Sequence, residues 1–178
     1  MTLLGNTLVF LLTLAGMEVF AWFAHKYIMH GWGWSWHRSH HQPGAGRFEK
    51  NDLYAVVFAG IAILLIALGT SGYHPLEWIG AGMIAYGFLY FLAHDGLVHR
   101  RWPFRYIPRR GYLKRLYQAH RLHHAVQEKD GCVSFGFLLV PPVAQLRQEL
   151  RAQHKESLRK TGRIGSSSRS LPEARRAW

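Results

Sequence analysis

The chain has a single cysteine, Cys132, and no CxxC pair, so it can form neither an intrachain disulfide nor a cysteine-based zinc or redox site. Acidic residues are also scarce, because 10 Asp and Glu accompany 22 Lys and Arg in 178 residues, a formal charge of +12. The sequence lacks the HExxH motif of zinc proteases and the Glu-x-x-His pairs of carboxylate-bridged di-iron bundles. These absences exclude a disulfide scaffold and both of those metal-site classes.

Three long apolar runs, residues 2–24, 53–70 and 76–93, predict membrane-spanning helices. Residues 53–70 contain no charge and no proline over 18 positions, which in a helix span roughly the 30 Å hydrocarbon core. The first run contains one acidic residue, Glu18. A carboxyl group at that depth is either a functional residue or the hydrogen-bond partner of a neighbouring helix.

A fourth apolar stretch, residues 131–146, is shorter and is interrupted by Pro141 and Pro142. It predicts a re-entrant or surface-embedded hairpin rather than a fourth crossing. Residues 145–178 are basic, with nine Lys and Arg against three Asp and Glu. We therefore expect an all-α integral membrane bundle in residues 1–150, followed by a basic, partly disordered tail in residues 151–178.

Positive charge predicts the orientation of these spans. Residues 26–52 carry four Lys and Arg and residues 94–130 carry nine, whereas residues 71–75, between the second and third runs, carry none. Because basic loops stay in the cytoplasm, both basic segments are expected to form a cytoplasmic helical cap on the bundle.

Ten of the twelve histidines lie in four short motifs. HKYIMH and HRSHH fall within residues 25–41, and HDGLVH and HRLHH fall within residues 94–124, so the order HX4H then HX2HH occurs twice. Two histidines, His74 and His154, belong to neither half. The ten are His25, His30, His37, His40, His41, His94, His99, His120, His123 and His124.

This spacing predicts metal binding. On a helix, residues i, i+3 and i+4 share a face, so each HX2HH triplet is expected to direct its three rings toward one common centre. The two residues of HX4H lie about 140° apart around an ideal helix and converge only at a helix end or on a local bulge. Crowded imidazoles would repel one another if protonated, whereas a metal ion requires the neutral form.

Counting ligands favours iron over zinc. Four-coordinate zinc would use at most eight histidines across two ions, whereas two octahedral ions with five imidazoles each leave one open position apiece. We expect no catalytic side chain beyond the metal centre, and we expect zinc to substitute for iron in purified protein. Asp95, Asn51 and Asp52 are candidate partners for imidazole N–H groups, with helix capping as the alternative.

The four motifs in this order, including HDGLVHRRWPFRYIPRRGYLKRLYQAHRLHH at residues 94–124, resemble the fatty acid hydroxylase superfamily of histidine-box membrane di-iron oxygenases. The resemblance covers about residues 1–150, and within the superfamily the chain is similar to bacterial carotenoid ring hydroxylases. It implies that the ten histidines bind two non-haem irons in the bacterial inner membrane. It also implies O2 as co-substrate, electrons from ferredoxin and ferredoxin reductase, and conversion of β-carotene through β-cryptoxanthin to zeaxanthin.

Spacing alone leaves two alternatives open. An oxygenase of the same class could hydroxylate or desaturate fatty acyl chains or sterols, and a non-catalytic membrane carrier could bind metal or haem. Phe88, Tyr90 and Phe91 in the third run are candidates to line a substrate tunnel, with ordinary packing as the alternative. The expected partners are a carotenoid drawn from the bilayer, membrane lipid and the electron donors, with no nucleic acid; the sequence does not set the oligomeric state.

Overall fold

The computed structural model describes residues 2–42, 44, 46, 48–101 and 106–160, and this part of the chain contains helices and no strand. As expected, the fold is all-α. The helices are α1 (Leu3–Phe23), η1 (Ala24–Trp32), α2 (Trp34–His41), α3 (Asp52–Thr70), α4 (Leu76–Tyr90), η2 (Phe91–Val98), α5 (Gly111–His123) and α6 (Val143–Lys160).

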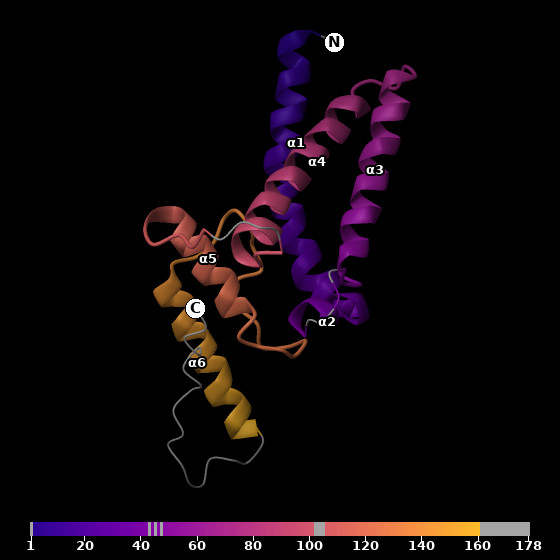
Figure 1. The fold of residues 1–178 in the computed structure, drawn as a ribbon. Coiled ribbons are helices and arrows are strands. Elements are labelled where there is room, and N and C mark those ends of the chain that lie inside the picture. The colour runs from indigo at the N-terminus through magenta and orange to yellow at the C-terminus, as the bar shows by residue number, and fades with distance from the viewer. Residues whose placement is uncertain (1, 43, 45, 47, 102–105, 161–178) are drawn as a thin grey trace.

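Three helical segments are long and apolar enough to cross a membrane, as the sequence predicted: Leu3–Trp32, Asp52–Thr70 and Leu76–Val98. Helices α1 and α3 both pack against α4, which crosses between them (Figure 1). Small residues permit this approach, since a Cβ atom at Gly82 would lie 2.8 Å from the Cβ of Thr13, and one at Gly80 would lie 2.6 Å from the carbonyl oxygen of Ala62.

The first and third spans both end in π-helix, the i→i+5 form that often marks functional sites. In η2 the amide of His99 donates to the carbonyl of His94 at 2.8 Å, which closes the π-turn across the HX4H pair. Because the π-helix brings residues i and i+5 onto one side, it supplies the local bulge that the HX4H spacing required. Residues 25 and 30 are carried by η1 in the same way.

As expected, the fourth apolar stretch forms no fourth spanning helix in the described chain. Residues 131–142 form an irregular segment without a helix, and α6 begins at Val143, directly after Pro141 and Pro142. Leu146 is fully buried with Ala119, which attaches α6 to α5. Helix α6 crosses the expected boundary at residue 150 and continues to residue 160. The remainder of the tail, for which partial disorder is expected, lies outside the described residues.

Glu18 attaches the irregular segment to α1. Its Oε1 accepts hydrogen bonds from the amides of Phe137, Leu138 and Leu139 at 2.8–2.9 Å, and its Oε2 accepts one from the Tyr86 hydroxyl at 2.7 Å. All four surrounding groups are donors, which is the complement of a carboxylate. Of the two roles expected for Glu18, the structure shows the hydrogen-bonding one.

Candidate metal centre

The four histidine motifs meet at one end of the helical bundle, where η1, α2, η2 and α5 converge (Figure 1). Nine of the ten histidines fall into two groups whose ligand nitrogens lie within 4.8 Å of one another. We call them the first group, which is His25, His30, His37, His41 and His123, and the second group, which is His40, His99, His120 and His124.

The tenth histidine, His94, lies against the second group. Its ring centroid is 4.4 Å from that of His99 and 4.7 Å from those of His40 and His120. The structure therefore gathers the ten histidines of the motifs as five and four with His94 adjacent. His74 instead pairs with Glu77 in the link between α3 and α4.

The expectation that each HX2HH triplet converges on one centre is wrong. In α2, His37 and His41 belong to the first group, whereas His40 belongs to the second. In α5 the division is reversed, because His120 and His124 belong to the second group and His123 to the first. Residues i and i+4 lie one above the other on a helix, whereas i+3 is displaced to the other side of that line, so each triplet contributes to both groups.

Five histidines donate from Nδ1 to neutral oxygen atoms of the chain. A carbonyl oxygen can only accept, so Nδ1 carries the proton and Nε2 has the free lone pair. The pairs are His25 with the carbonyl of Phe135 at 3.0 Å, His30 with Lys129 at 2.7 Å, His41 with Val126 at 2.9 Å, His123 with Val133 at 2.9 Å, and His37 with Oδ1 of Asn51 at 2.7 Å.

The Nε2 atoms point at one another. Nε2 of His25 lies 3.1 Å from that of His37, and Nε2 of His123 lies 3.2 Å from those of His30 and His41. Two unprotonated nitrogens at this distance repel unless a cation lies between them. Neutral nitrogen donors aimed at a common centre are the ligand set that imidazole-binding metal ions require, so these residues fit the metal that the sequence predicted.

The second group has the same convergence, with Nε2 of His120 at 2.9 Å from His99 and 3.0 Å from His124. The outer partners of His40 in this group and of the adjacent His94 differ from those of the first group, because they are carboxylates. Glu49 lies 2.9 Å from Nδ1 of His40, and Asp95 lies 2.7 Å from Nδ1 of His94. Nε2 of His40 is buried and has no hydrogen-bond partner in the described chain, as expected of a ligand atom.

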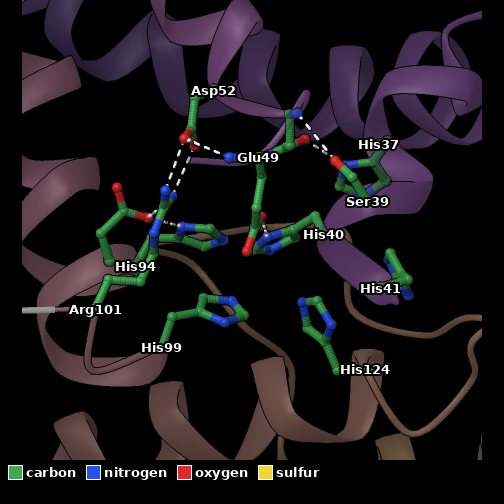
Figure 2. A network of polar contacts seen from close by, with 12 residues as sticks. His37, Ser39, His40, His41, Glu49, Asp52, His94, His99, Arg101 and His124 are labelled. Atoms are coloured by element: carbon green, nitrogen blue, oxygen red, sulfur yellow. Dashed lines mark hydrogen bonds and ion pairs between the residues drawn. The ribbon is translucent and has the colours of Figure 1, made fainter. Parts of the chain in front are cut away.

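Of the predicted outer partners, Asn51 and Asp95 contact imidazoles and Asp52 does not. Within the described residues the Asp52 carboxylate instead holds Arg101, through bonds of 2.7 and 2.6 Å, and accepts from the amide of Glu49 (Figure 2). Arg101 also lies 3.8 Å from Asp95. Glu49 was not among the residues predicted from the sequence, because the candidates in this region were Asn51 and Asp52 at the start of the second span. Glu49 lies nine residues after His40 in the sequence.

Burial keeps these imidazoles neutral. It lowers the pKa of His37 to about 2, with neighbouring His25 adding to the effect, and it lowers the pKa of His41 to about 4. Burial and the charge of Arg101 together lower the pKa of His99 to about 4. At neutral pH the histidines are therefore available as metal ligands. Burial also raises the pKa of the Cys132 thiol to about 12, so this cysteine is unreactive.

An apolar cavity of about 390 Å³ lies between the three spans and ends on the histidines. The predicted tunnel residues Phe88, Tyr90 and Phe91 all line it, and the imidazoles of both groups reach its inner end. Gly87 also lines the cavity, and a Cβ atom at this position would have no neighbour within 4 Å. This glycine therefore leaves room in the cavity and is not at a close helix contact. The histidine residues at that end are His25, His37, His94 and His120.

Comparison with known proteins gives a consistent result. Residues 10–141 match the fatty acid hydroxylase family. The beta-carotene hydroxylase of Pantoea ananas is 68% identical over 149 residues, covering 84% of this chain and 85% of that protein. The beta-carotene hydroxylase of Pseudescherichia vulneris is 58% identical over 176 residues, covering 96% and 100%.

A more distant relative is the chloroplastic beta-carotene 3-hydroxylase 1 of Arabidopsis thaliana, 39% identical over 166 residues, which are 87% of this chain and 53% of that protein. No solved structure matches the chain.

Proposed function

Because this chain belongs to the fatty acid hydroxylase family, we propose that it is a membrane carotenoid hydroxylase that adds hydroxyl groups to the rings of β-carotene at C3 and C3′. The products are β-cryptoxanthin and then zeaxanthin. One observation carries the proposal: the apolar cavity between the spans ends on both histidine groups. A hydrocarbon ring that enters from the bilayer reaches the metal positions without passing through water.

The cavity residues select an apolar, elongated substrate. The volume of the cavity suits one ring of the substrate and the adjacent part of its chain rather than a whole C40 molecule. The two rings of β-carotene would therefore be hydroxylated one at a time. Aromatic side chains from different spans form the walls, among them Phe20 of α1, Phe58 of α3 and Phe91 of η2. These residues supply apolar contact area and exclude water from the reacting carbon.

The histidines would hold two non-haem iron ions, with zinc as a competing occupant during purification. When bound, the irons supply the redox chemistry for attacking an unactivated C–H bond with O2, which side chains alone do not provide. The chain fixes the tautomer and direction of each imidazole through the oxygen atoms that accept from Nδ1. Each hydroxyl group formed consumes one O2, two electrons and two protons and releases one water.

We propose ferredoxin, reduced by ferredoxin reductase, as the electron donor. This route requires the histidines to face the cytoplasm, as the positive charge of residues 94–130 predicts. The single native thiol, Cys132, is buried, so introduced cysteines can be probed with little background. In intact cells an impermeant thiol reagent should label Ser71→Cys and miss Glu156→Cys. Labelling of Glu156→Cys would overturn the orientation.

The activity itself is tested by pigment extraction. Bacterial cells that accumulate β-carotene should produce zeaxanthin when they express the chain, and His123→Ala should abolish it because it removes a nitrogen of the first group. Hydroxylated or desaturated fatty acids or sterols without zeaxanthin would instead support the related lipid oxygenases. A Soret band in the purified protein would support a haem carrier. The close packing of His40, His99 and His124, whose ring centroids lie 4.2–4.8 Å apart, disfavours it.

A further inference from the structure

The outer hydrogen-bond partners of the two histidine groups differ in charge. Every oxygen that accepts from Nδ1 in the first group is neutral, being a backbone carbonyl or the Asn51 amide. On the second side, by which we mean the second group together with the adjacent His94, Nδ1 of His40 faces the carboxylate of Glu49 and Nδ1 of His94 faces that of Asp95. Figure 2 shows Glu49 against His40, and Arg101 beside His94.

The formal charges around the two groups differ in the same direction. Glu49, Asp52 and Asp95 surround the second side with three negative charges, of which the guanidinium of Arg101 balances one. On the side of the first group, Asp130 and Lys129 near His30 carry opposite formal charges. The ammonium of Lys26 adds a positive charge there, lying 5.8 Å from the Phe135 ring.

A carboxylate that accepts the Nδ1 proton makes the imidazole a stronger electron donor, and a negative environment stabilises the more highly charged state of a bound ion. We propose that Glu49 and Asp95, which neighbour the Asp52–Arg101 ion pair, make the two metal positions unequal: the second position favours the ferric state, and the first position is reduced more readily. This rests on the proposed di-iron function and extends it to the order in which electrons are accepted.

Arg101 and the two carboxylates are positioning residues, because each acts through a histidine or through another side chain. Arg101 joins the start of α3 to the end of η2, since Asp52 begins α3 and Asp95 belongs to η2. Its backbone amide also donates to the carbonyl of Asp95 at 2.9 Å. The guanidinium, held by Asp52, thus lies 3.8 Å from the carboxylate that contacts His94.

The test is a mediated redox titration of the purified protein loaded with ⁵⁷Fe, in which Mössbauer spectra count ferric and ferrous ions at each potential. The wild-type protein should show two midpoint potentials and a half-reduced state with one ion of each kind. Glu49→Gln should raise the lower potential and leave the higher one unchanged. An outer-partner change is worth about 10- to 100-fold in metal affinity, which corresponds to about 60–120 mV if it acts on one oxidation state.

Asn51→Asp is the reciprocal variant, because it gives His37 in the first group a carboxylate of nearly the same shape. It should lower the higher potential and leave the lower one unchanged. Glu156→Gln is the matched control, since it removes a negative charge from an exposed residue of α6 that pairs with Lys160, and it should change neither potential.

Several results would overturn the inference. A single shared potential in the wild type would do so, as would equal movement of both potentials in Glu49→Gln or an unchanged higher potential in Asn51→Asp. If Glu49→Gln retains only one iron, retention of the higher-potential ion supports the assignment and retention of the lower-potential ion contradicts it. Potentials that shift as expected in a protein that makes no zeaxanthin would refute the substrate while leaving the inequality in place.

Discussion

Glu18 offers the sharpest test of how the membrane part of the chain supports the metal centre. Glu18→Ala would leave four buried or partly buried donors without an acceptor, three backbone amides of residues 137–139 and the hydroxyl of Tyr86. Each unsatisfied buried group costs about 1–3 kcal/mol, so the free energy of unfolding should fall by roughly 4–12 kcal/mol before relaxation. A typical domain is stable by about 5–15 kcal/mol, so little folded protein should accumulate.

Two milder variants separate the charge from the hydrogen bonds. Glu18→Gln keeps a carbonyl oxygen for the three amides, and the Tyr86 hydroxyl can turn to accept from the new amide group, so the loss should be about 1–3 kcal/mol. Tyr86→Phe removes only one donor and should cost less than Glu18→Ala. The expected order of stability is wild type, then Tyr86→Phe and Glu18→Gln, then Glu18→Ala.

The effect should extend to the metal centre, because residues 133 and 135 of the same segment accept from His123 and His25. The assays are thermal unfolding in lipid nanodiscs and metal content per folded chain. Loss of metal at a temperature at which Glu18→Gln remains folded would show that the segment aligns these imidazoles. The reasoning would be refuted by a Glu18→Ala protein that unfolds at the wild-type temperature and holds as much metal.

Three further predictions concern the histidines and the cavity. His123→Ala should abolish zeaxanthin formation and lower the metal content, whereas His74→Ala, which disturbs only a contact in the link, should retain most activity at equal abundance; comparable loss in both would contradict the grouping. The pKa of His41 is about 4 in the folded chain and about 6.5 when unfolded, so the unfolded state binds more protons between these two pH values. The unfolding temperature of the metal-free protein should therefore fall as pH drops from about 6.5 to 4. A flat profile would count against burial of this ring. Gly87→Phe should fill the cavity and suppress conversion of β-carotene with metal content unchanged, whereas Gly16→Phe, equally open but outside the cavity, should convert it normally.

Local sequence patterns account for the three spans and for the set of ten histidines. Uninterrupted apolar runs of about 20 residues predicted the three spans, since only a helix satisfies its own backbone in hydrocarbon. The repeated HX4H and HX2HH spacing singled out the ten histidines that the structure brings together, and the HX4H spacing required the distortion that the π-helices η1 and η2 supply. Asn51 and Asp95 were found because they lie beside a helix start or a histidine.

Which histidines face each other, and which atoms accept from them, depends on the packing of segments that are distant in the sequence. Helical periodicity sets His40 apart from His37 and His41 on α2, but which histidines of the other segments meet each subset follows from how those segments pack together. His25 donates to the carbonyl of a residue 110 positions away, and Glu18 accepts from amides about 120 positions away. Such partners are backbone atoms that every residue type carries. Their identity follows from how distant segments pack and leaves no mark in the residue pattern.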